Sequence, residues 1–162
     1  MKSVIVYYSM SGNVCMVAEE VAKHLGADLL EIKPVKAYPD KGIIKFLWGG
    51  KCAVMGETPK LEPYTFDAEG YDTIIFGTPV WASNITPPLR SFIKENADAL
   101  NGKRVAAFVC YAGGGADKAI GKLKALLGVA TLAGELILVD PKDKPQAEHL
   151  SQIEAFCHSL AD

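Results

Sequence analysis

Two patterns of apolar residues alternate along this chain, strand-like segments and helical spacings. Strand-like segments occur at residues 2–8, 28–33, 71–77, 104–110 and 132–140. Stretches with helical apolar spacing follow these segments, at i, i+3, i+4 and i+7. Strands that alternate with amphipathic helices predict an α/β fold, a parallel sheet covered by helices on both faces.

The helix limits follow from the spacing and from the residues that flank it. We expect one helix from Val14 to Leu25, before Gly26, and a second from the cap Thr86 through Pro87 and Pro88 to Leu100. A third helix carries Ile120, Leu123 and Leu127 and ends at Gly128. A last helix turns Leu150, Ile153, Cys157 and Leu160 towards the core. Residues 34–70 contain several prolines and Gly49-Gly50, and they predict one helix in two pieces.

Strand number selects the topology. Right-handed crossovers leave two common arrangements, the Rossmann order and the order 2-1-3-4-5. Five strands favour the second, so we expect a doubly wound five-stranded parallel sheet in a single domain over residues 1–162.

Composition excludes several classes of protein. The chain is 49% apolar and 22% charged, with a net charge of −2, which gives no basic surface for nucleic acid or for a membrane. No apolar run is long enough to span a bilayer, and the run "VIVYY" is too short for a signal-peptide core. We therefore expect a cytoplasmic protein.

The four cysteines, Cys15, Cys52, Cys110 and Cys157, show no Cys-x-x-Cys pair and no zinc spacing. The favoured interpretation is small buried side chains that stay reduced. A redox-active thiol is the alternative.

Three polar turns follow the first, third and fourth predicted strands. Their sequences are "SMSGN", "GTPVWASN" and "YAGGGA". In this topology ligands bind at the carboxyl ends of the strands where the strand order reverses, so the three turns are expected to meet there. The turn after the fifth strand, "DPKDKP", reads as a plain solvent-facing loop.

The first turn has the features of an anion site. Ser9, Ser11 and Asn13 precede a helix whose first N–H groups are unpaired and electropositive, and Gly12 allows close approach. Ordinary capping of the helix is the alternative. The turn lacks Gly-x-x-x-x-Gly-Lys-Ser/Thr and Gly-x-Gly-x-x-Gly, which favours one terminal phosphate.

The other two turns suit a flat ring. Trp81 offers a stacking surface, although a tryptophan folded over the end of the sheet is the alternative. Gly113-Gly114-Gly115 allow backbone N–H groups to approach a ligand edge, or they form a flexible lead-in to a helix. A monophosphate at one end and a ring at the other match FMN.

At these residues the sequence resembles the flavodoxin family, and most closely its bacterial flavodoxin-like flavoproteins. The resemblance rests on "YYSMSGNV", "YDTIIFGTPVWASNITPPLRSFI" and "YAGGG" and covers nearly the whole chain. It implies non-covalently bound FMN. By position, the phosphate would be held by Ser9, Met10, Ser11, Gly12, Asn13 and Val14, one ring face by Thr78, Pro79, Val80 and Trp81, and the other side and polar edge by Tyr111, Ala112, Gly113, Gly114 and Gly115.

Three features depart from the family pattern. Val14 stands where the family has threonine, the net charge is near neutral instead of strongly acidic, and residues 34–70 are long for a second crossover. Trp48 or Phe46 in that segment would cover the flavin in one interpretation. A helix packed on the sheet is the favoured one.

The resemblance implies a flavin-based electron carrier that serves redox partner proteins, with no catalytic side chain and no metal. The alternative is an FMN-dependent NAD(P)H or quinone reductase. A phospho-acceptor module needs aspartates at the ends of the early strands, where this chain has Tyr7-Tyr8 and Phe76-Gly77. A phosphatase that uses Cys15 would need a nearby arginine.

Overall fold

A computed structural model describes residues 1–39 and 42–161, and within them five strands form one parallel sheet of order β2-β1-β3-β4-β5. The strands are β1 (Ser3–Tyr7), β2 (Asp28–Glu31), β3 (Thr73–Pro79), β4 (Arg104–Tyr111) and β5 (Glu135–Val139). The predicted topology is therefore confirmed. The strand order reverses between β1 and β3, where a ligand crevice is expected.

Both faces of the sheet are buried, because successive strand side chains point to opposite sides. Val4 and Val6 belong to one apolar cluster and Ile5 and Tyr7 to the other. This explains why the strands read as continuous apolar runs rather than as an alternating pattern.

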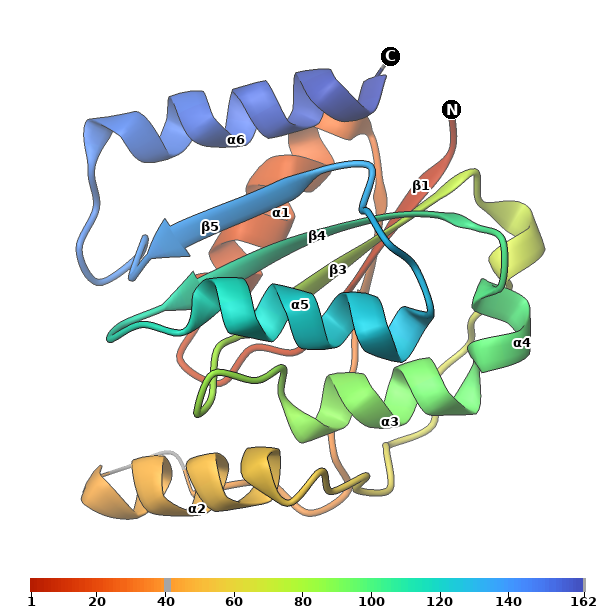
Figure 1. Cartoon of the computed structure of the whole chain (residues 1–162). Helices are drawn as coiled ribbons and strands as arrows, with labels where there is room; N and C mark the ends of the chain where they lie inside the picture. The colour runs from red at the N-terminus through yellow and green to blue at the C-terminus, as the bar shows by residue number, and fades with distance from the viewer. Residues whose placement is uncertain (40–41, 162) are drawn as a thin grey trace.

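Helices cover the two faces in pairs (Figure 1). Their bounds are α1 (Asn13–Leu25), α2 (Gly42–Val54), α3 (Pro87–Glu95), α4 (Ala97–Leu100), α5 (Ala116–Leu127) and α6 (Ala147–Ala161), with a short 3-10 turn at Ala68–Gly70. The helices α1 and α6 lie on one face, and α3 and α5 lie on the other.

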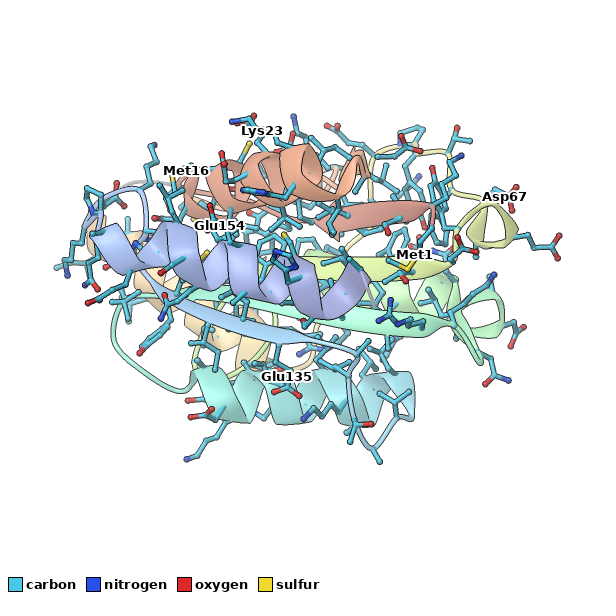
Figure 2. The ribbon with its side chains drawn as sticks, turned by 90° about the horizontal axis from the view of Figure 1, so that it is seen from above. Met1, Met16, Lys23, Asp67, Glu135 and Glu154 are labelled. Atoms are coloured by element: carbon cyan, nitrogen blue, oxygen red, sulfur yellow. The ribbon has the colours of Figure 1, made fainter. Side chains whose placement is uncertain are left out.

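The view from above shows α6, with Glu154, beside α1, with Met16 and Lys23 (Figure 2). Glu135 at the start of β5 forms an ion pair with Lys124 of α5 on the opposite face. Each face of the sheet is therefore covered by helices that lie far apart in the sequence, as α1 and α6 do.

Three sequence-based expectations about helices need correction. The helix expected to run to Leu100 is divided at Asn96, whose side-chain Nδ2 donates to the carbonyl of Phe92 at 2.8 Å. Leu150 is 57% exposed, because the buried face of α6 follows Ile153, Phe156 and Leu160 instead. The expected two-piece helix within residues 34–70 is the continuous α2.

Gly77 on β3 leaves room for a large side chain on the neighbouring strand. Gly77 is opposite Phe108 of β4 in the strand register, and Phe108 is fully buried. A Cβ atom at residue 77 would lie 2.8 Å from Cε2 of the Phe108 ring. The ring therefore fills the space that the missing side chain provides.

We predict that Gly77→Ala lowers the free energy of unfolding by about 2 kcal/mol or more, because a buried ring must leave its rotamer to avoid the new methyl group. Gly121→Ala is the matched control, since nothing lies within 4 Å of a Cβ at this position in α5. The control should stabilise the protein by roughly 0.5–1 kcal/mol through its helix propensity. Urea denaturation of both variants measures the difference, and equal stabilities would contradict the packing argument.

Candidate functional site

The turns after β1, β3 and β4 meet at one cavity of about 330 Å³ at the carboxyl ends of these strands. This volume is within the range of small-molecule sites. The cavity is lined by Ser9, Met10, Ser11, Asn13, Val14, Gly49, Gly50, Pro79, Val80, Trp81, Ala82, Cys110, Tyr111, Ala112, Asp140 and Asp143. Ten of the residues proposed from the sequence are among them.

The turn between β1 and α1 presents a row of backbone donors. Within the described residues, the N–H groups of Met10 to Val14 have no protein acceptor. Gly12 precedes the helix in the left-handed region, with φ of 92°. These N–H groups and the positive end of the α1 dipole together form a binding site for an anion.

The hydroxyl groups of the same turn remain available as donors. Ser9 Oγ accepts a bond from the Cys15 backbone N at 3.1 Å and so pairs one N–H of the first turn of α1, although the cap residue itself is Gly12, which has no side-chain cap bond. Ser11 Oγ accepts a bond from Asn13 Nδ2 at 3.3 Å. Since both oxygens act as acceptors in these bonds, their O–H groups are free to donate.

Asn13 joins this turn to the loop after β5. Its Nδ2 donates to Asp143 Oδ2 at 2.9 Å, and its Oδ1 accepts from the Lys142 backbone N at 2.8 Å. Lys142 Nζ donates to the Ser11 carbonyl at 3.1 Å. The loop "DPKDKP" faces solvent at residues 142–145 as expected, but it is not a plain loop, because it also holds the donor turn in place.

Trp81 forms one wall of the cavity and is held in place by other aromatic rings. Its ring makes edge contacts with Tyr8, at a centroid distance of 5.8 Å, and with Tyr38, at 5.3 Å. Burial raises the pKa of Tyr8 to about 12, so this ring stays neutral at physiological pH. A Cβ at Gly49 of α2 would lie 3.2 Å from the indole, so α2 packs closely behind Trp81.

The loop after β3 is a tight turn with a strained backbone. Trp81 and Asn84 exchange two backbone hydrogen bonds of 3.0 Å, and Ala82 and Ser83 between them have φ of 49° and 58°. Positive φ is uncommon for residues other than glycine, and such strain concentrates at functional sites. The turn places Ala82 on the cavity wall.

The glycines after β4 have a structural role that the sequence did not indicate. A Cβ at Gly115 would lie 2.8 Å from Ser83 Cβ, so this glycine lets the tight turn approach. Tyr111 and Ala112 line the cavity, whereas Gly113, Gly114 and Gly115 do not. The assignment of these three glycines to the polar edge of a ring stays a prediction.

Two other proposed residues also lie outside the cavity lining, Gly12 and Thr78. Thr78 is fully buried, and its hydroxyl lies 3.0 Å from that of Thr86 and accepts a bond from the Thr86 backbone N at 3.3 Å. Thr78 thus fixes the start of α3, and its assignment to a ring face stays a prediction.

Sequence reasoning missed six lining residues, Gly49, Gly50, Ala82, Cys110, Asp140 and Asp143. The aspartates follow β5, which borders β4, so the strand order itself places them near the crevice. Gly49 and Gly50 belong to α2, whose position no periodicity in residues 34–70 reveals.

The helix α2 does not pack on the sheet, so the favoured interpretation of this segment is wrong. Figure 1 shows α2 beyond α3, away from the strands. Trp48 is 54% exposed, and the side chain of Phe46 lies outside the described part of the structure.

Three of the four cysteines are buried, as the favoured interpretation has it, whereas Cys15 is only half-buried. Burial raises the pKa of Cys52 and Cys157 to about 11 and that of Cys110 to about 12, so these thiols are protonated at neutral pH. Across the described residues, no group of three His, Cys, Asp or Glu side chains is arranged to hold a metal ion.

The described residues also contain no helix that is both long and apolar enough to cross a bilayer. A search of curated proteins finds no match. Solved structures share the fold. A flavoprotein from Lactobacillus acidophilus in complex with FMN has a TM-score of 0.72 at 19% identity, over 96% of this chain and 97% of that one.

Two further neighbours are flavodoxins. Oxidised flavodoxin 1 from Bacillus cereus has a TM-score of 0.62 at 19% identity, over 99% and 97% of the two chains. A WrbA-like flavodoxin from Agrobacterium tumefaciens has a TM-score of 0.64 at 18% identity, over 99% and 94%. The family model described as flavodoxin matches residues 2–149, and this chain belongs to the flavodoxin family.

Proposed function

We propose that this protein binds FMN non-covalently in the cavity at the carboxyl ends of β1, β3 and β4, and that it carries electrons. The row of unpaired backbone N–H groups from Met10 to Val14, at one end of a cavity walled by Trp81, is the observation that carries the proposal. Flavodoxins are themselves the standard example of an FMN site at this switch point, so the position alone adds no independent support.

The donor turn fits a terminal phosphate. Neutral backbone N–H groups and the hydroxyls of Ser9 and Ser11 would satisfy its oxygens, with the α1 dipole as the favourable field. Val14 contributes its N–H but no hydroxyl, so this site has one side-chain donor fewer than the usual family pattern.

The other end of the cavity fits a flat ring. Trp81 and Tyr111 come from different turns and both line the cavity, together with Pro79 and Val80, which directly precede Trp81. The edge contacts of Trp81 with Tyr8 and Tyr38 fix the indole before a ligand arrives, which lowers the entropy cost of binding.

The bound cofactor would supply one- and two-electron redox chemistry. The side chains of the site hold and shield instead of transferring protons. Asp140 is paired with Lys144 at 3.4 Å, Asp143 accepts from Asn13, and burial keeps the Cys110 thiol protonated. Among the described lining residues, both carboxylates already have a polar partner, which favours a carrier that exchanges electrons with redox partner proteins in the cytoplasm.

One observation favours the second candidate, an FMN-dependent NAD(P)H or quinone reductase. The net charge is only −2, whereas an acidic carrier uses its charge to steer towards basic partners. A small-molecule reductant needs no such steering.

Binding of FMN and riboflavin tests the phosphate assignment, since the two flavins differ only by the phosphate. We predict that the protein binds FMN more tightly than riboflavin, and that Asn13→Ala weakens FMN binding by about tenfold or more. The variant loses two hydrogen bonds that shape the donor turn, each worth about 0.5–1.5 kcal/mol. Riboflavin affinity should change little, and quenching of flavin fluorescence measures both.

Asn101→Ala is the control, since this exposed asparagine lies in the loop before β4, outside the cavity lining. Failure of the wild-type protein to bind either flavin would refute the proposed function. Equal affinities for both flavins would refute the phosphate site alone.

The two tryptophans provide a matched pair for the ring site. We predict that Trp81→Leu weakens binding of FMN and riboflavin alike, by about tenfold, because stacking contributes roughly 0.5–1.5 kcal/mol beyond area burial. Trp48→Leu removes an exposed ring outside the cavity lining and should leave both affinities unchanged. The same fluorescence titration measures both variants, and unchanged binding to Trp81→Leu would place the ring elsewhere.

Anaerobic mixing of the FMN-loaded protein with NADPH or NADH separates carrier from reductase. We predict slow bleaching of the flavin absorbance without a partner protein and fast bleaching with a reductase that feeds electron carriers. Rapid steady-state turnover with NAD(P)H and a quinone alone would instead establish the second candidate.

A further inference from the structure

The helix α2 and Met55, the residue directly after it, carry six exposed apolar side chains, which we call the α2 apolar face. Its members are Ile43, Ile44, Leu47, Trp48, Val54 and Met55, and each is between 54% and 76% exposed. They form two rows, 43-47-54 and 44-48-55, with spacings of four and seven residues, so they share one side of the helix. Lys51 lies between the rows.

This exposure is not a consequence of a loosely attached helix. The opposite side of α2 is buried through Cys52 and Ala53, and Gly49 packs against Trp81. The carbonyl of Ala53 accepts from Asn84 Nδ2 at 3.0 Å and from Arg90 Nη2 at 3.4 Å. One side of α2 is therefore anchored in the fold, while the other is exposed among the residues that the structure describes.

The size of the face is that of a protein interface. With ordinary side-chain areas, the exposed fractions amount to an apolar surface on the order of 800 Å². Monomers seldom expose contiguous apolar patches larger than a few hundred Å². A standard interface buries about 800 Å² on each partner, so the area of the face is comparable to what a stable dimer needs.

The composition of the face favours a second copy of this chain over a redox partner. Encounters between electron carriers and their partners are small and rely on complementary charge. Homodimer interfaces are more apolar, and Lys51 is the sole charged residue among the described side chains between the rows. An apolar stripe is also self-complementary about a two-fold axis.

From these observations we infer that the protein forms a homodimer through the α2 apolar face, with two α2 helices packed across a two-fold axis. Figure 1 shows α2 at the margin of the molecule, beyond α3, where a second copy can approach without meeting the sheet. Gly49 and Gly50 on the other side of α2 line the cavity, so the proposed dimer contact is on the side of the helix that faces away from the site.

The mass of the full-length protein in solution tests this inference and does not depend on flavin binding. Sedimentation velocity at micromolar concentrations should give twice the 17.4 kDa of the single chain. Leu47→Glu and Val54→Glu each place a charge within the α2 apolar face, and both variants should sediment as monomers with unchanged circular dichroism. Leu150→Glu is the control, since Leu150 on α6 is exposed to a similar extent but lies outside the face, and it should remain dimeric.

A monomeric wild-type protein would overturn the inference. If that monomer also bound phosphatidylcholine vesicles, the α2 apolar face would be assigned to a membrane surface instead. Dimers that persist in both glutamate variants would overturn it as well. Equal dissociation of Leu150→Glu would show that the effect is not specific to the α2 apolar face.

Discussion

The unpaired N–H groups between β1 and α1 are the constraint on which the site depends. The first N–H groups of a helix have no intrahelical acceptor, so the row at the mouth of this cavity is available to acceptors that a ligand supplies. The tight passage from strand to helix through Gly12 leaves them unpaired, and the bonds from Asn13 to Lys142 and Asp143 keep the turn in that shape. An anion supplies such acceptors, which links the local backbone geometry directly to the proposed phosphate site.

The opposite end of the cavity depends on contacts between loops rather than on strand geometry. The positive φ values of Ala82 and Ser83 are tolerated because Trp81 and Asn84 close the turn and because Gly115 leaves space for it. The same Asn84 anchors the end of α2, so the aromatic wall and the α2 apolar face share one support. A ligand that presses on Trp81 therefore acts on the helix that we propose as the dimer contact.

Local sequence patterns predicted the sheet and the convergence of three turns, because both follow from short-range periodicity and strand order. The structure differs from these predictions wherever contacts between residues far apart in the sequence determine the arrangement. Leu150 has helical spacing with Ile153, yet it is exposed, and Phe156 is buried on this helix instead. The clamp of Lys142 on the donor turn joins residues about 130 positions apart, and no local pattern signals it. The place of α2 was likewise not predictable, because its anchors are single side chains on α3 and on the loop before it.

The most direct test of the central claim follows the backbone amides of Met10 to Val14 by ¹⁵N–¹H correlation NMR during titration with FMN and with riboflavin. Hydrogen bonds to a phosphate should move these amide proton resonances strongly downfield with FMN and leave them nearly unchanged with riboflavin, while resonances near Trp81 respond to both. Equal responses of the five amides to the two flavins, or none to FMN, would contradict the account.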